Sequence, residues 1–268
     1  MDSLKIMVIS LNKSKVGQYT VYHRKESEFV RNYDELFVRH LYKLPPTNEK
    51  VTIIDAGAHI GMSTLYIKML CPNAKVICFE PNPYTFDILK KNIQENGLKD
   101  IILVNKALSD HVGQATLFGE LNGITADTRG NSIIADWGIR ANTEELAVAT
   151  TKLSEYITED IYFLKMDLEG AETIIIPEIG DRIKKINYAV IDLHAVGAQG
   201  EEELDRLVRK IEVTHAVEIV DKDVNVSIPG RWHDWLVKSK PIMKVLYAQR
   251  LIDRNEKELV VNMAQKGL

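Results

Sequence analysis

Two short apolar runs in the sequence stop at an aspartate and then turn through glycine: VTIIDAGAHIG at 51–61 and IYFLKMDLEGAE at 161–172. A strand that leads through a glycine turn into a helix presents free backbone N–H groups. These groups attract negative charge and tolerate a closely approaching ligand. Hydroxyl groups in the first helical turn can add further hydrogen-bond donors. In the first run the residues with these properties are Gly57, Gly61, Ser63 and Thr64.

The next predicted strand ends in an acidic residue, Glu80, about 25 residues after Asp55. A carboxylate at the tip of a neighbouring parallel strand is placed to accept hydrogen bonds from both hydroxyls of a ribose, so the two strand ends predict a nucleoside-containing ligand. A dinucleotide normally requires glycine in the middle of G-x-G-x-x-G. Here that position is His59, whose Cβ would crowd a pyrophosphate. S-adenosylmethionine has no phosphate and fits this turn better; an NAD-dependent oxidoreductase is the alternative.

The second aspartate, Asp167, ends the strand that is expected beside the first one, across the point where the strand order reverses. Ligands of open α/β sheets bind in that crevice. If a methyl group is transferred to a hydroxyl or a neutral amine, a residue there must take up a proton. The candidates are Asp167, Glu169 and His194. His194 is favoured because an imidazole with a pKa of about 6.5 suits a base at neutral pH.

Structural roles compete with these assignments. Glu169 and Glu172 stand where a helix is expected to begin near Gly170, and carboxylates at a helix N-terminus stabilise the helix dipole. We expect this capping role for Glu172, whereas both roles stay open for Glu169. Asp167 and His194 could also bind a metal as a pair, but two ligands do not make a site. No metal site is therefore predicted.

The elements that must position these residues alternate between strand and helix after residue 50. The strands are apolar without polar alternation, as expected for a parallel sheet that is buried on both faces. Two runs near the end are too close for a crossover helix and should pair as an antiparallel hairpin. The fold class is therefore α/β, doubly wound and mostly parallel. Strands are predicted at 51–55, 75–80, 101–105, 161–166, 187–193, 215–220 and 234–239, and helices at 61–70, 83–96, 171–178 and 201–213.

The remaining segments predict three divisions of the chain. Residues 1–46 form an N-terminal appendage, with strands at 4–11 and 18–23 joined by a turn around Gly17 and a helix at 27–43. Residues 47–240 form the main domain, with an edge strand at 113–118 and a long polar loop at 119–145. A loop of that length usually has a function, and we expect a mobile lid over the acceptor pocket. Residues 241–268 form a helical tail that packs on its own domain or on a partner subunit in a homo-oligomer.

Composition excludes several classes of protein. The chain has 268 residues, 45% hydrophobic residues and a net charge of −4, which gives no electrostatic basis for nucleic-acid binding. No apolar run reaches the roughly 18 residues of a membrane span, and the N-terminus lacks the pattern of a signal peptide. Cys71 and Cys78 lack C-x-x-C spacing and are expected to be reduced. These features predict a cytoplasmic protein.

Six motifs occur in a familiar order and spacing: DAGAHIG, FEPNP, NKALSD, TKLSEYI, FLKMDLEGAE and VIDLHA. Over roughly residues 50–195 the sequence resembles the FkbM-like family of S-adenosylmethionine-dependent methyltransferases, and KMDLEGAE is its most specific element. Two positions depart from the family pattern. The family usually has asparagine where this chain has His59, and aspartates in the segment that here contains Ser154 and Glu155.

The resemblance implies a seven-stranded class I methyltransferase fold and a site for S-adenosylmethionine. It implies methyl transfer to a hydroxyl oxygen of a small molecule or glycan; a nucleoside-binding module without catalysis is a further alternative. Asp167 would face the sulfonium end of the cofactor, while Asp55 would bind it or merely brace the glycine turn. By the same resemblance, Asp55, Gly57, His59, Gly61, Ser63 and Thr64 surround the methionine part, Glu80 holds the ribose, Pro81 and Asn82 shape the turn beside it, and Lys106 and Ala107 flank the adenine.

Overall fold

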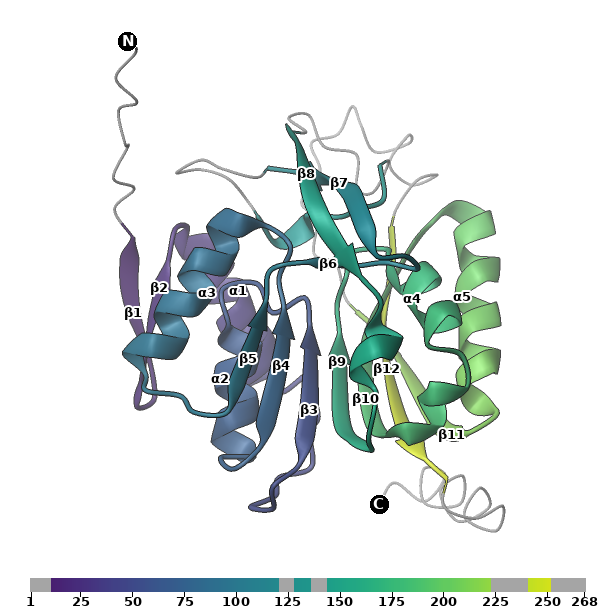
Figure 1. Cartoon of the computed structure of the whole chain (residues 1–268), viewed down its shortest axis with the longest axis horizontal. Coiled ribbons are helices and arrows are strands. Elements are labelled where there is room, and N and C mark those ends of the chain that lie inside the picture. Colours follow the sequence, from purple (N-terminus) through teal and green to yellow (C-terminus); the bar gives the residue numbers. More distant parts are fainter. Residues whose placement is uncertain (1–10, 121–127, 136–143, 223–240, 252–268) are drawn as a thin grey trace.

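A seven-stranded sheet lies at the centre of the computed structural model, which describes residues 11–120, 128–135, 144–222 and 241–251 (Figure 1). The strand order is β11-β12-β10-β9-β3-β4-β5. Every pairing is parallel except those of β12, which is antiparallel to both of its neighbours. The predicted doubly wound, mostly parallel sheet with an antiparallel end is therefore confirmed. Its strands are β3 (Thr52–Ala56), β4 (Lys75–Phe79), β5 (Ile101–Val104), β9 (Ile161–Met166), β10 (Ile186–Val196), β11 (His215–Asp221) and β12 (Pro241–Arg250).

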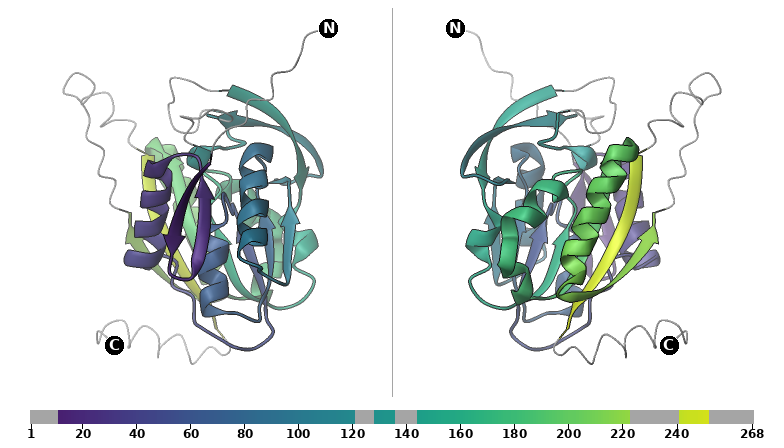
Figure 2. Two further views of the ribbon diagram at one scale, coloured as in Figure 1. Left: turned by 90° about the vertical axis from the view of Figure 1, so that its left-hand side faces the viewer. Right: turned by 90° about the vertical axis from the view of Figure 1, so that its right-hand side faces the viewer.

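Both faces of this sheet are apolar and covered by helices, because alternate residues of a strand point to opposite faces. Ile53 belongs to one core cluster and Ile54 to the other. Helices α1 (Glu26–Tyr33), α2 (Met62–Leu70) and α3 (Pro83–Glu95) pack on the first face, and α4 (Glu172–Ile179) and α5 (Gly197–Glu212) on the second (Figure 2). In the described part of the chain, no helix combines the length and the apolarity needed to cross a membrane.

The chain end differs from the prediction. Residues 241–250 form strand β12, inserted between β10 and β11, so the predicted helix is wrong over these residues. Val245 packs into one core cluster and Leu246 into the other, which shows the two-residue period of a strand buried on both faces. In a short apolar run this period is not distinguishable from that of a helix. The strand predicted at 234–239 and the end of the tail, 252–268, lie outside the described residues.

The N-terminal segment is a hairpin followed by a helix, as predicted, but with shifted bounds. Strands β1 (Asn12–Val16) and β2 (Tyr19–His23) pair around Gly17, while the predicted strand at 4–11 lies almost wholly outside the described residues. Helix α1 continues into a π-helical turn, η1 (Asp34–Val38), and ends there. The prediction of a helix to residue 43 is too long, since His40 adopts a φ of 49°. Val21 and Leu36 share one hydrophobic core with Ile53, so this segment packs directly against the main domain.

A second, three-stranded sheet lies over the carboxyl ends of β3, β4 and β9 (Figure 1). It consists of β6 (Ala107–Leu108), β8 (Glu144–Thr151) and β7 (Gly113–Gly119). The sequence predicted β7 as an edge strand and did not predict β8. Of the long loop predicted at 119–145, residues 121–127 and 136–143 lie outside the described residues, so the expected mobility of the loop stays a prediction. The short helices are η2 (Thr128–Gly130), η3 (Leu153–Tyr156) and η4 (Gly180–Lys185).

Candidate active site

A cavity of about 320 Å³ opens at the carboxyl ends of β3, β4 and β9. Its volume lies in the range of small-molecule sites, and its position is the crevice where open α/β sheets bind ligands. The walls come from both glycine turns, from residues 128–133 and from the N-terminal segment. Among the predicted site residues, Gly57, His59, Ser63, Glu80, Pro81, Lys106, Ala107, Asp167 and Glu169 line the cavity, whereas Asp55, Gly61, Thr64, Asn82 and His194 do not.

The first glycine turn is closed against the second one. Gly57 has a φ of 81°, and a Cβ built on it would lie 2.0 Å from the backbone oxygen of Asp167. The backbone N–H of Asp167 in turn donates to the carbonyl of Ala56. Only glycine satisfies both the conformation and the close approach at position 57. The two motifs that the sequence singled out therefore meet directly at the floor of the cavity.

Asp55 braces the turn from below. It is fully buried, and its Oδ2 accepts hydrogen bonds of 2.7 Å from the hydroxyls of both Ser63 and Thr64. Both hydroxyls hold helix α2 onto the strand end, and of the two residues only Ser63 also lines the cavity. Of the two roles considered for Asp55, this geometry supports the bracing role.

Lys165 completes this brace, and sequence reasoning did not identify it. Its side chain is 2% exposed, and Nζ donates to the carbonyls of Ala56 and Gly57 at 3.2 and 2.5 Å. The same ammonium group lies 3.5 Å from Asp55 and 3.9 Å from Asp167. A buried lysine between two carboxylates holds both strand ends at a fixed separation. A single lysine inside the apolar strand FLKM was the available signal.

Glu80 stands at the end of β4 with both oxygens facing backbone donors. Oε2 accepts from the N–H of His59 and Oε1 from that of Asn82, each at 2.9 Å. Burial raises the pKa of Glu80 to about 7, although these hydrogen bonds and the charge of Lys165 act in the opposite direction. Asn82 itself caps helix α3 by accepting from the N–H of Tyr84. The carboxylate is thus locked in place beside the cavity.

The segment 128–133 is tied to three distant parts of the chain. Thr128 Oγ1 lies 2.8 Å from Nε2 of His59, and its N–H donates to the buried carboxylate of Glu28 in α1. Ser132 donates to the carbonyl of Glu169 at 2.7 Å. His59 has a φ of 51°, a left-handed conformation that histidine adopts more readily than most side chains. These contacts place the described part of the long loop against the cavity.

Asp167 faces the cavity with a side chain that is 26% exposed. The hydroxyl of Tyr42, from the N-terminal segment, donates to Oδ2 at 3.0 Å. Burial alone would raise the pKa of Asp167, but the positive charges around it, with Lys165 the strongest, lower it to about 2. The side chain is therefore a carboxylate at any physiological pH.

The N-terminal segment also supplies a charged wall that the sequence did not predict. Glu35 lines the cavity and lies 3.6 Å from Lys222, which in turn contacts the buried Asp192 at 2.5 Å. Burial raises the pKa of Glu35, and Lys222 opposes that effect. The three residues are far apart in sequence, so only the fold brings them together. The described part of the N-terminal segment, 11–46, thus contributes to the site as well as to the core.

The structure corrects the expected role of His194. The side chain is 1% exposed and does not line the cavity. Burial would lower the pKa of His194, but the surrounding carboxylates, Asp192 foremost, outweigh it and hold this pKa well above its usual value. A side chain enclosed by carboxylates and away from the cavity is not placed to act as a general base on an acceptor there. Glu172 beside it stands in the first turn of α4, as predicted, and accepts from the N–H groups of Leu168 and Gly170, so it fixes the turn that leads into the helix.

Comparison with known proteins gives consistent matches. A family model described as methyltransferase FkbM domain matches residues 55–218. Methyltransferase 1 of Beauveria bassiana is 28% identical over 175 residues, which are 58% of this chain and 68% of that protein. Methyltransferase sdnD of Sordaria araneosa is 28% identical over 190 residues, 61% of this chain and 73% of that protein. The hexuronic acid methyltransferase AglP of Haloferax volcanii is 21% identical over 196 residues, 71% of this chain and 75% of that protein.

Proposed function

Because the chain belongs to the family of FkbM-domain methyltransferases, we propose that it transfers a methyl group from S-adenosylmethionine to a hydroxyl oxygen of a small molecule or glycan. The observation that carries this proposal is the single cavity in which the glycine turn, Glu80 and Asp167 meet. The glycine turn would hold the amino-acid part of the cofactor, and Glu80 would hold the ribose of its nucleoside part. Asp167 would stand where the methyl group is transferred.

The residues present fit this cofactor. The turn at Gly57 leaves no room for a Cβ and exposes backbone to the cavity. Glu80 offers a fixed carboxylate for the ribose hydroxyls. The side chain of Asn131 also lines the cavity, and neither its nitrogen nor its oxygen has a hydrogen-bond partner among the described residues. Buried polar groups without partners are rare, so a polar ligand at this place is supported.

S-adenosylmethionine supplies an activated methyl group on a positively charged sulfur. The residues of the chain must align the acceptor and remove its proton. As the new C–O bond forms and the C–S bond breaks with its electrons on sulfur, the hydroxyl group becomes a far stronger acid. Even a carboxylate with a low pKa then accepts the proton, and Asp167 faces the cavity beside the first glycine turn, while the oxygens of Glu80 already accept from the N–H groups of His59 and Asn82. We therefore propose Asp167 as the proton acceptor in place of His194.

The lining away from the glycine turn supports a hydroxyl-rich acceptor. Arg31, Asn32, Glu35, Arg129 and Lys222 contribute to it, and such side chains can donate to and accept from sugar hydroxyls. The relative from Haloferax volcanii, named a hexuronic acid methyltransferase, points to the same class of acceptor. For location we propose the cytoplasm, since both cysteines are free thiols in the structure.

Calorimetric titration of the full chain tests the cofactor first. S-adenosylmethionine and S-adenosylhomocysteine should bind, and NAD should not. Transfer of a radiolabelled methyl group to a panel of sugars, uronic acids and hydroxylated small molecules then tests the reaction, with the product bond located by NMR. NAD binding in place of S-adenosylhomocysteine would favour the oxidoreductase alternative. Methylation of amines alone would contradict the proposed hydroxyl acceptor.

The pKa of Glu80 makes cofactor binding depend on pH. Ribose hydroxyls donate to the ionised carboxylate, so binding favours the deprotonated form. With a pKa of about 7 in the free protein, the affinity for S-adenosylhomocysteine should rise about tenfold between pH 6 and pH 8 and level off above that. The charged groups that act on Glu80 are Lys165 and Asp55, and these two form an ion pair with each other.

Titration calorimetry in buffers of different ionisation enthalpy should show proton release on binding at pH 6. The matched control is Glu80→Gln, in which the affinity should be weaker and nearly flat over the same range. A pH-independent affinity in the unsubstituted protein would show that Glu80 does not contact the ligand.

A further inference from the structure

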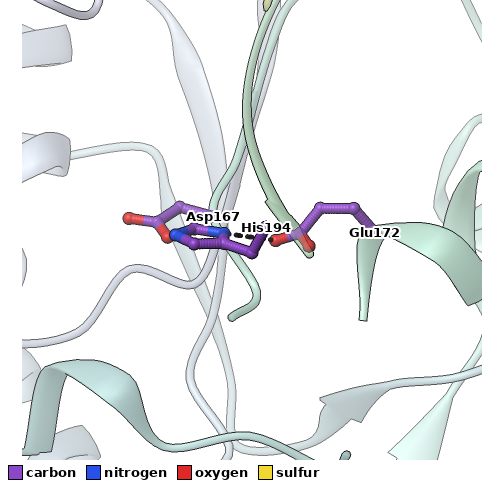
Figure 3. A group of neighbouring side chains, drawn as sticks. All are labelled: Asp167, Glu172 and His194. Atoms are coloured by element: carbon purple, nitrogen blue, oxygen red, sulfur yellow. Dashed lines mark ion pairs between the residues drawn. The ribbon is translucent and has the colours of Figure 1, made fainter. Parts of the chain in front are cut away.

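One histidine and several carboxylates converge beneath the cavity floor. Each of three side chains, Asp167, Glu172 and His194, offers one ligand atom (Figure 3). These three atoms lie within 4.8 Å of one another. The closest pair is His194 Nδ1 and Glu172 Oε1, 3.4 Å apart. Two ligands of an octahedral ion at about 2.1 Å lie about 3 Å apart at right angles and about 4.2 Å apart when opposite. The Nδ1–Oε1 pair is therefore only roughly half an ångström wider than two such ligands at right angles.

Among the residues that the structure describes, carboxylates outnumber lysines around His194. Two further carboxylates face the same imidazole, Asp192 at 3.7 Å and Glu169 at 4.0 Å from Nε2. Among the described residues, the nearest ammonium groups are those of Lys165 and Lys222, and each is shared with yet another carboxylate, Asp55 and Glu35 respectively. Buried carboxylates are stable only when paired or bound to a cation.

A buried oxygen provides an independent indication. Asp192 is fully buried, and while its Oδ2 contacts Lys222, its Oδ1 has no hydrogen-bond partner among the described residues and points to Nε2 of His194. In metal sites a carboxylate commonly faces the second nitrogen of a ligating histidine and orients the ring. With Nδ1 nearest Glu172 and Nε2 facing Asp192, His194 has that arrangement.

We propose that Asp167, Glu172 and His194 bind a divalent cation of the Mn²⁺ or Mg²⁺ class. Carboxylates suit both ions, and the imidazole nitrogen favours Mn²⁺. Both oxygens of Glu172 accept backbone N–H groups, and each keeps a second lone pair for an ion. The sequence alone offered only two of these ligands; helix α4 brings the third. Because Asp167 lines the cavity, the cation would hold and polarise the acceptor oxygen, a role that rests on the proposed function.

Binding of Mn²⁺ alone to the full chain tests the site without any methyl acceptor. Electron paramagnetic resonance should show one tightly bound Mn²⁺ per chain, displaced by excess Mg²⁺. Pulsed measurements should show coupling to a directly bound nitrogen. His194→Gln should remove that coupling and weaken binding at least tenfold. The matched control is His111→Gln, which alters an exposed histidine 2.8 Å from Asp110 and should change neither.

If His194→Gln does not fold, Asp167→Asn provides a second variant, because the Asp167 side chain is partly exposed and its replacement disturbs the core less. Asp167→Asn should weaken Mn²⁺ binding tenfold or more. Absence of tight Mn²⁺ binding, absence of nitrogen coupling, or equal weakening by His111→Gln would overturn the site. Methyl transfer by a chain that binds no Mn²⁺ would overturn the site and leave the proposed function intact. Mn²⁺ binding without any transfer to hydroxyl acceptors would support the site and count against the function.

Discussion

Asp167→Asn should lower the turnover number about 10²–10⁴-fold, the usual effect of losing a group that accepts a proton in the transition state. The amide has nearly the same shape but carries no charge and does not take up a proton. The carboxylate is held in place by Tyr42 at 3.0 Å and lies beside the first glycine turn. Steady-state kinetics with saturating cofactor and acceptor measures the effect.

The same substitution should separate two ligands that differ in charge. S-adenosylmethionine carries a positive sulfur and S-adenosylhomocysteine a neutral one, so loss of the Asp167 charge should weaken the first more than the second. Asp110→Asn, an exposed aspartate outside the cavity, is the matched control and should leave kinetics and binding unchanged. Near-normal turnover in Asp167→Asn would assign the proton to another residue, with Glu169 next in position.

Glu80→Ala should weaken the binding of S-adenosylhomocysteine about 10- to 100-fold, or about 1.5–3 kcal/mol, as expected for a charge-assisted contact to the ribose. The side chain is 6% exposed, and its two oxygens also fix the N–H groups of His59 and Asn82. The loss therefore combines the contact itself with a looser turn. Calorimetric titration measures the affinity.

The control for this variant is Glu95→Ala on the exposed side of α3, where the carboxylate contacts only Lys13 among the described residues. That change should leave the affinity unaltered. Thermal unfolding of both variants checks that the fold is kept. If Glu80→Ala bound S-adenosylhomocysteine as tightly as the unsubstituted protein, the ribose would lie elsewhere, and the cofactor assignment for the whole β4 end would be wrong.

The sequence by itself determined most of the central sheet and the glycine turns and acidic strand end at the cavity. Apolar strands, glycine turns and the acidic tip of β4 are local signals, because backbone conformation and burial of a parallel strand are encoded within a few neighbouring residues. The strand Ile161–Met166 has the predicted bounds, and Gly57 and Glu80 lie at the cavity as expected. The same local signals did not separate strand from helix at 241–250, because the apolar residues of this short run fit both the period of a strand and the period of a helix.

The tertiary structure decided which charged residues line the cavity away from the glycine turn and the electrostatics of the ionisable groups. Tyr42, from the N-terminal segment, and Lys222, from the chain after β11, act on Asp167 together with Lys165, which precedes it by two residues at the end of β9. His194 was expected to be a base from its ordinary pKa, yet three carboxylates around it hold this pKa well above its usual value, and its side chain does not line the cavity. A pKa depends on burial and on charges within a few ångströms in space. Asp192 shares strand β10 with His194, but Glu169 and Glu172 come from the turn before α4 and from α4 itself, so the folded chain decides the role of His194.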